Sequence, residues 1–117
     1  MSDGRRPLRA VDLPRRRAPA GLSTSSAAWW RTIMDEWVLD PHHERLLEQA
    51  CRAWDRCEAA RLRVEADGMM VSSPRYGAKP HPLIGVERDA RLQFVRIVRA
   101  LGLDESAPLP AVGARRR

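Results

Sequence analysis

The sequence has few residues that could perform catalysis. Two cysteines and three histidines are spread over 117 residues, and there is neither a glycine-rich phosphate loop nor a Gly-x-Ser-x-Gly elbow. Cys51 and Cys57 fall on one expected helix and point about 120° apart, so they cannot form a disulfide while that helix is intact. His42 and His43 occupy adjacent, divergent positions with no further ligands in sight. We expect no enzyme, no cofactor and no metal site.

Long apolar segments are also missing. The longest uncharged run is shorter than the roughly 18 apolar residues of a membrane span, and Met1 to Arg17 contains no apolar stretch of signal-peptide length. We therefore expect a single soluble domain in the cytoplasm, without a membrane partner and with reduced cysteines.

The positive charge is concentrated at the two ends of the chain. The net charge is +6, whereas residues 18–114 carry slightly more acidic than basic groups. Flexible arginine-rich segments bind phosphates by counterion release and add affinity without reading sequence; a role in solubility alone stays open. The candidate DNA-contacting residues are Arg5, Arg6, Arg9, Arg15, Arg16, Arg17, Arg115, Arg116 and Arg117.

Three helices are predicted between these ends. Tryptophans and aliphatic residues at spacings of three and four predict a helix over 25–38. Asp40-Pro41 is typical of an N-cap and first helical residue, and predicts a long helix that Gly68 ends. His81-Pro82 begins a third helix, which Gly102 ends.

The remaining segments are short. Met69 to Val71 reads as a strand, and a small hairpin or ordered loop should follow it up to residue 81. We expect a disordered basic arm over 1–22, a helical domain over 23–104 and a disordered tail over 105–117. The predicted fold is all-α: an N-terminal helix and a long antiparallel helical hairpin, joined by a short β-hairpin-like loop.

The second helix has two apolar strips. One is a continuous seam of mostly small residues, Leu46, Ala50, Ala53, Cys57, Ala60 and Val64, which suits close packing against the third helix. That helix offers a matching row: Leu83, Val86, Ala90, Phe94, Ile97 and Leu101. The second strip contains Leu47, Cys51, Trp54 and Leu62. Either the first helix or a neighbouring subunit could cover it, or both at different levels.

Charges on the same helix also separate by side. Arg45, Arg52, Arg56 and Arg63 line up, and Glu44, Glu48, Asp55, Glu58 and Glu65 lie opposite. The pattern fits a solvated face with intrahelical pairs, or a head-to-tail ring in which basic and acidic sides meet. The candidate oligomer interface is Leu47, Cys51, Trp54 and Leu62 together with Arg45, Arg52 and Arg56.

A run of short motifs gives the sequence a family resemblance. Gly68 with a short strand, then Lys79-Pro80-His81-Pro82-Leu83, and finally Leu101-Gly102-Leu103 resemble the small subunit of tailed-phage terminases. The family motif residues are Gly68, Lys79, His81, Pro82 and Leu83. No clear helix-turn-helix precedes the hairpin, and the chain is short for the family.

The resemblance implies a non-enzymatic packaging factor in the bacterial host cytoplasm. Such subunits form rings, bind viral DNA and present it to the large terminase subunit, whose ATPase and nuclease act on it. The partners implied are DNA, further copies of the chain and that large subunit. Two alternatives stay open: a small dimeric transcriptional regulator encoded by a phage, and an adaptor whose charged arms bind acidic proteins.

Overall fold

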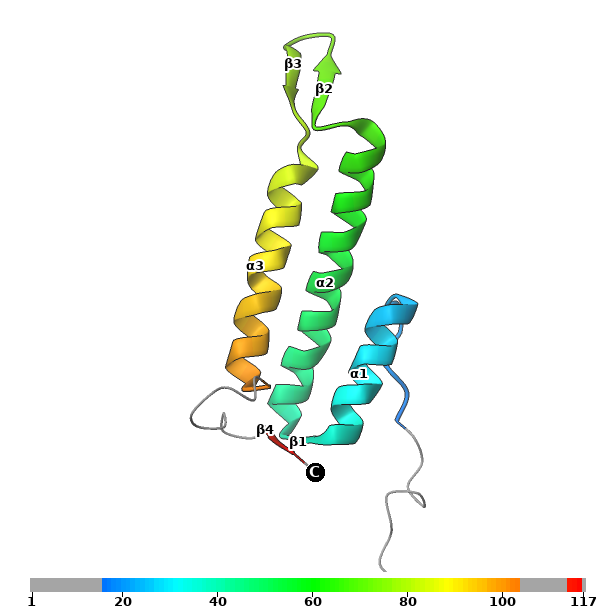
Figure 1. Ribbon diagram of the computed structural model, residues 1–117, viewed down its shortest axis with the longest axis vertical. Coiled ribbons are helices and arrows are strands. Elements are labelled where there is room, and N and C mark those ends of the chain that lie inside the picture. The colour runs from blue at the N-terminus through cyan, green and yellow to red at the C-terminus, as the bar shows by residue number, and fades with distance from the viewer. Residues whose placement is uncertain (1–15, 104–113, 117) are drawn as a thin grey trace, which may run out of the picture.

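The computed structural model describes residues 16–103 and 114–116, and this part of the chain is mostly helical, as predicted (Figure 1). The helices are α1 (Thr24–Glu36), α2 (Pro41–Asp67) and α3 (Leu83–Leu101). α2 and α3 run side by side in opposite directions, and α1 lies along the N-terminal part of α2 (Figure 1).

The helix ends follow from local chemistry. Ser23 caps α1, because its hydroxyl accepts the N–H of Ser26 at 3.1 Å. Pro41 opens α2, where its missing N–H leaves no hydrogen bond unmade. Gly68 (φ +89°) and Gly102 (φ +68°) follow α2 and α3 with positive φ angles that glycine accepts without a Cβ clash. The predicted stops are confirmed.

The region after α1 differs from the prediction. The expected helix over 25–38 ends at Glu36, and Trp37–Leu39 forms strand β1 instead. β1 pairs antiparallel with β4 (Ala114–Arg116), with Val38 opposite Arg115. The prediction of disorder throughout 105–117 is therefore wrong for residues 114–116, and residues 104–113 lie outside the described part. The two strands are some 75 residues apart, so the helical spacing of residues 25–38 could not predict their pairing.

Two strands join α2 to α3. β2 (Met70–Ser73) and β3 (Gly77–Pro80) form an antiparallel hairpin, with Met70 opposite Pro80 and Ser73 opposite Gly77. The hairpin projects beyond the ends of both helices (Figure 1). Most of its residues are exposed, so it contributes little to the core.

The core lies at the opposite end of the helical pair from this hairpin. Its buried cluster is Trp30, Ile33, Met34, Trp37, Leu39, Leu47, Cys51 and Leu101. Between α2 and α3, the seam residues Ala50, Ala53, Cys57, Ala60 and Val64 are buried as well. Small side chains there let the two helices approach closely. Packing is thus complete at one end and reduced to a single seam toward the other.

The described part of the predicted N-terminal arm, residues 16–22, lies against the helices. Ala18 and Leu22 pack on the core cluster, and Arg52 donates a hydrogen bond to the Ala20 carbonyl oxygen at 3.1 Å. The expected disorder up to residue 22 is wrong for this stretch, which is held by these contacts and by the ion pair of Arg16 with Glu44.

Candidate assembly surface

The position of α1 decides which part of the second apolar strip is covered. Asp55 on α2 accepts three hydrogen bonds from the start of α1: from the Ser23 N–H (2.8 Å), the Ser23 hydroxyl (2.6 Å) and the Ser26 hydroxyl (2.6 Å). Burial by itself would raise the pKa of Asp55, but these hydrogen bonds and nearby Arg52 outweigh it and lower the pKa. Asp55 therefore fixes the level on α2 at which α1 begins.

On the N-terminal side of Asp55, the second apolar strip of α2 is buried within the chain. Leu47 and Cys51 are fully covered, and Cys51 shares a contact with the backbone of Ser26. Their assignment to an oligomer interface is wrong, because α1 occupies that face. Burial also raises the pKa of the Cys51 thiol to about 12, so it stays protonated and unreactive. Both cysteines are free thiols.

On the C-terminal side of Asp55, the same strip is exposed to solvent. Leu62 lies seven residues beyond Asp55, about 10 Å farther along the helix, and is 55% exposed. Trp54, at the boundary, is 42% exposed. The single strip read from the sequence is therefore two surfaces: one covered by α1, the other left without cover by the described part of the chain.

An aromatic cluster closes the junction of the three helices. The Phe94 ring of α3 lies 5.7 Å from Trp29 of α1 and 5.2 Å from Trp54 of α2, measured between ring centroids. A hollow of about 300 Å³ opens beside these rings, with Ser25 and Ser26 on its wall. Trp54 thus packs against Phe94 and is at the same time partly exposed to solvent.

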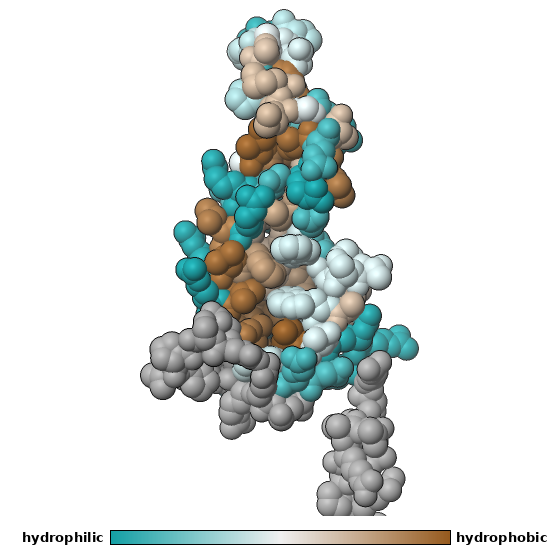
Figure 2. All heavy atoms as spheres, viewed as in Figure 1, coloured by the Kyte–Doolittle hydropathy of each residue, from teal (hydrophilic) through white to brown (hydrophobic). Residues whose placement is uncertain are grey.

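α3 carries a second apolar surface. Ile84, Leu92 and Val95 recur along one side of the helix and are 36%, 48% and 37% exposed; we call them the α3 ridge. Arg88 and Arg99 lie on the same side by helical spacing. Along this side of the molecule, Figure 2 shows hydrophobic and hydrophilic side chains interleaved. The α3 ridge is not among the surfaces predicted from the sequence, although the spacings of eight and three residues between its members place them on one side of a helix.

The charges of α2 are largely matched within the chain. All five predicted acidic partners are engaged: Glu44 with Arg16 (2.6 Å), Glu48 with Arg52 (3.0 Å), Asp55 with Ser23 and Ser26, and Glu58 and Glu65 with Arg61 (2.8 Å each). On the basic side, Arg63 pairs with Asp67. This arrangement favours the reading of a solvated face over charge pairing between subunits. Arg45 and Arg56 are exposed and have no ion-pair partner within residues 16–103.

More than half of the predicted DNA-contacting arginines lie outside the part of the chain that the structure describes. Arg5, Arg6, Arg9, Arg15 and Arg117 lie outside the described residues. Arg17 is exposed, while Arg16 pairs with Glu44 and has its guanidinium 6.0 Å from the centre of the Trp30 ring. Arg115 and Arg116 belong to β4. The structure thus spreads these arginines between the arm and the β1–β4 end.

The residues of the family motif form the link between the β-hairpin and the helices. His81 is buried, and its Nδ1 accepts the N–H of Leu83 at 3.0 Å. The ring proton therefore lies on Nε2, which donates to Asp67 at 2.9 Å. This hydrogen bond is the main reason that the pKa of Asp67 is lowered, and Arg63 adds to it. Lys79 and Pro82 are exposed and Leu83 is half-buried. His81 joins the two helices at the base of the β-hairpin.

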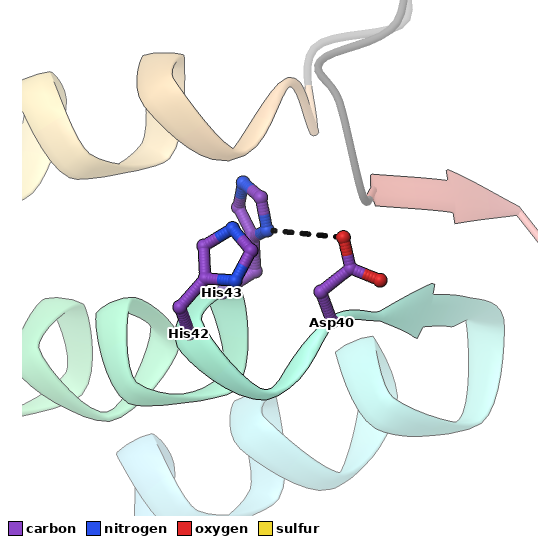
Figure 3. Close-up of side chains that lie close together, drawn as sticks. All are labelled: Asp40, His42 and His43. Atoms are coloured by element: carbon purple, nitrogen blue, oxygen red, sulfur yellow. Dashed lines mark ion pairs between the residues drawn. The ribbon is translucent and has the colours of Figure 1, made fainter.

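A cluster of possible metal ligands lies at the start of α2. Asp40, His42 and His43 each offer one ligand atom, and these atoms all lie within 4.8 Å of one another (Figure 3). The prediction of two divergent, isolated histidines omits Asp40, whose N-cap position places it outside the regular helix and beside them.

The fold places the chain among small, mostly helical proteins. None of the helices in residues 16–103 is long and apolar enough to cross a membrane. The family model described as phage terminase, small subunit matches residues 27–108, which is more than half of the chain. The chain therefore belongs to the phage terminase small subunit family. Neither the curated proteins nor the solved structures gave a match.

Proposed function

We propose that this chain is the DNA-binding, oligomeric small subunit of a phage terminase, which binds viral DNA and presents it to the large subunit for genome packaging in the host cytoplasm. In this role the chain performs no catalysis itself, and the large subunit supplies the ATPase and nuclease. The observation that carries the proposal is the uncovered apolar surface on a helical pair that belongs to this family.

Two exposed apolar surfaces support self-assembly of the chain. On α2, Trp54 lies at the boundary of the surface that α1 covers and Leu62 lies beyond it. The α3 ridge lies on the other long helix. Exposed apolar patches, as distinct from single exposed side chains, are typical of surfaces that another molecule covers. Because copies of the chain carry two such surfaces, one surface of each copy can meet the other surface of the next. This heterologous contact builds a ring when its rotation closes.

The positive charge available for DNA binding lies at the two ends of the chain. The body between the tails has almost no net charge, and several of its carboxylates are held by its own arginines. The basic excess is left to the arm and to the C-terminal arginines, which would contact phosphates without reading bases. A ring multiplies these weak contacts, since each copy adds its own arm. Candidate residues are Arg5, Arg6, Arg9, Arg15 and Arg17, with Arg115, Arg116 and Arg117.

Salt-dependent DNA binding tests this assignment. Replacing Arg5, Arg6 and Arg9 by Gln should weaken binding of a packaging-site fragment and reduce the slope of log K against log salt by about 3, since each lost phosphate contact removes about 0.9. A matched control replaces three exposed arginines of the body, Arg31, Arg75 and Arg96, by Gln. If the arm variant and the control bind equally well, the arm does not hold DNA.

Footprinting separates packaging from the alternatives. A packaging factor protects DNA near the packaging site, whereas a transcriptional regulator protects phage promoters. An adaptor for acidic proteins protects neither, and deletion of residues 1–17 leaves its DNA retention unaltered. Protection of promoters alone would overturn the packaging role while leaving family membership in place.

A further inference from the structure

Asp40 stands at the N-cap of α2 but does not cap the helix. An aspartate at this position ordinarily accepts a hydrogen bond from an N–H of the first helical turn, and the Asp40 side chain makes none. Its Oδ2 instead lies 4.0 Å from Nδ1 of His43, too far for a hydrogen bond. The carboxylate is therefore turned toward the imidazole, away from its usual helical partner (Figure 3).

His43 presents a buried nitrogen that lacks a partner. Its side chain is 10% exposed, and among the described residues its Nδ1 has no hydrogen bond. Buried polar atoms are almost always satisfied, because an unsatisfied one carries the full loss of its hydration. A cation placed between this nitrogen and the Asp40 carboxylate would satisfy both groups.

His42 completes a set of three ligands. Its ring centroid lies 4.1 Å from that of His43, and the three ligand atoms lie within 4.8 Å of one another. Tetrahedral zinc with nitrogen and oxygen ligands holds them roughly 3.4 Å apart, so separations of up to 4.8 Å must shorten by up to about 1.4 Å. Asp40 is partly exposed and its side chain makes no capping hydrogen bond, and His42 is exposed. Both side chains can therefore rotate toward the buried His43.

The chemistry of the set favours zinc over calcium and magnesium. Two imidazoles and one carboxylate suit zinc, whereas calcium and magnesium prefer oxygen ligands alone. The positive end of the helix dipole opposes a cation at this place, and the Asp40 carboxylate offsets it. Glu44, the next carboxylate along the helix, is held by Arg16 at 2.6 Å and stays outside the set.

We propose that Asp40, His42 and His43 bind one zinc ion per chain, with a water molecule in the fourth position. Asp40 directly follows Leu39 of β1, which pairs with Ala114 of β4. Zinc bound here ties β1 to the first turn of α2 and so stabilises the end of the molecule where the C-terminal strand docks. The proposal does not depend on the role in packaging.

Calorimetric titration of the full chain with zinc, free of any histidine tag, tests the site. We expect one zinc per chain, and at least tenfold weaker binding after His42→Gln or Asp40→Asn. Asp89→Asn is the matched control, because Asp89 is an exposed carboxylate whose ion pair within residues 16–103 is with its neighbour Arg88. The absence of zinc binding to the wild-type chain, or equal binding by the wild type and His42→Gln, would overturn the proposal.

Two further readouts keep the test independent of folding. Because His42 is exposed, His42→Gln should retain the wild-type circular dichroism spectrum. Zinc at about 100 times the wild-type dissociation constant should raise the melting temperature of the wild type by several degrees, and that of His42→Gln by no more than about half as much. Cobalt in place of zinc should give the visible absorption of a tetrahedral ion in the wild type alone. An equal thermal shift in both proteins contradicts the site.

Discussion

Replacing Asp55 by alanine should detach the start of α1 from α2. The carboxylate accepts hydrogen bonds from Ser23 and Ser26 at 2.6 to 2.8 Å. Hydrogen bonds to charged groups contribute about 1.5 to 3 kcal/mol each when they are shielded from water. These are exposed or partly buried, and they share one acceptor group, so we expect a loss of about 2 to 4 kcal/mol in the free energy of unfolding.

The effect should depend on pH in a defined direction. Because the folded protein lowers the pKa of Asp55 below its ordinary value of 3.8, the unfolded chain takes up the proton first as the pH falls. The stabilisation by the carboxylate is complete well above pH 4 and is lost as the pH falls through the folded pKa. The difference between the wild type and Asp55→Ala should therefore be full at pH 7 and shrink below about pH 4.

Urea denaturation followed by circular dichroism measures this difference, with all proteins at one concentration because association adds to apparent stability. Asp89→Ala serves as the control, since an exposed ion pair of this kind contributes at most about 1 kcal/mol. An Asp55→Ala protein as stable as the control, or a difference that does not change between pH 7 and pH 3, would refute the anchoring role of Asp55.

Three other substitutions probe the seam, the open surface and the link at the base of the β-hairpin. Ala53→Leu should crowd the α2–α3 seam and lower the free energy of unfolding by about 1 to 3 kcal/mol; unchanged denaturation would mean that the seam is loosely packed. Leu62→Glu should weaken self-association in sedimentation experiments without changing the monomer fold, whereas Gln49→Glu, which adds the same charge elsewhere on α2, should not. His81→Phe should let the pKa of Asp67 rise toward its ordinary value, as an NMR titration of the carboxyl carbon would show; an unchanged pKa would contradict the assigned hydrogen bond.

The helices were predictable because their signals are local. Proline at the first position of α2 and glycine after α2 and α3 mark the ends through backbone geometry alone. The small residues of the α2 seam fall at one helical period, so the packed face could be read from spacing. The pairing of β1 with β4 could not, because it joins segments far apart in sequence and contains only three residues on each side.

The candidate surfaces were only half predictable. Leu47 and Leu62 belong to one strip in the sequence, and nothing in their spacing says where α1 stops. That level is set by Asp55 and two serines, a tertiary contact. The ligand set at the start of α2 was missed for a related reason. Helical angles describe His42 and His43, whereas Asp40 adopts the extended backbone of an N-cap and so falls outside that description.

Light scattering during gel filtration tests the central claim most directly, namely that copies of this chain cover one another's exposed helical surfaces. At tens of micromolar, the account predicts one species whose mass is a whole multiple, greater than one, of the 13.3 kDa chain, and a shift toward smaller species for Leu62→Glu. A wild-type protein that elutes as a stable 13.3 kDa monomer at that concentration would contradict it.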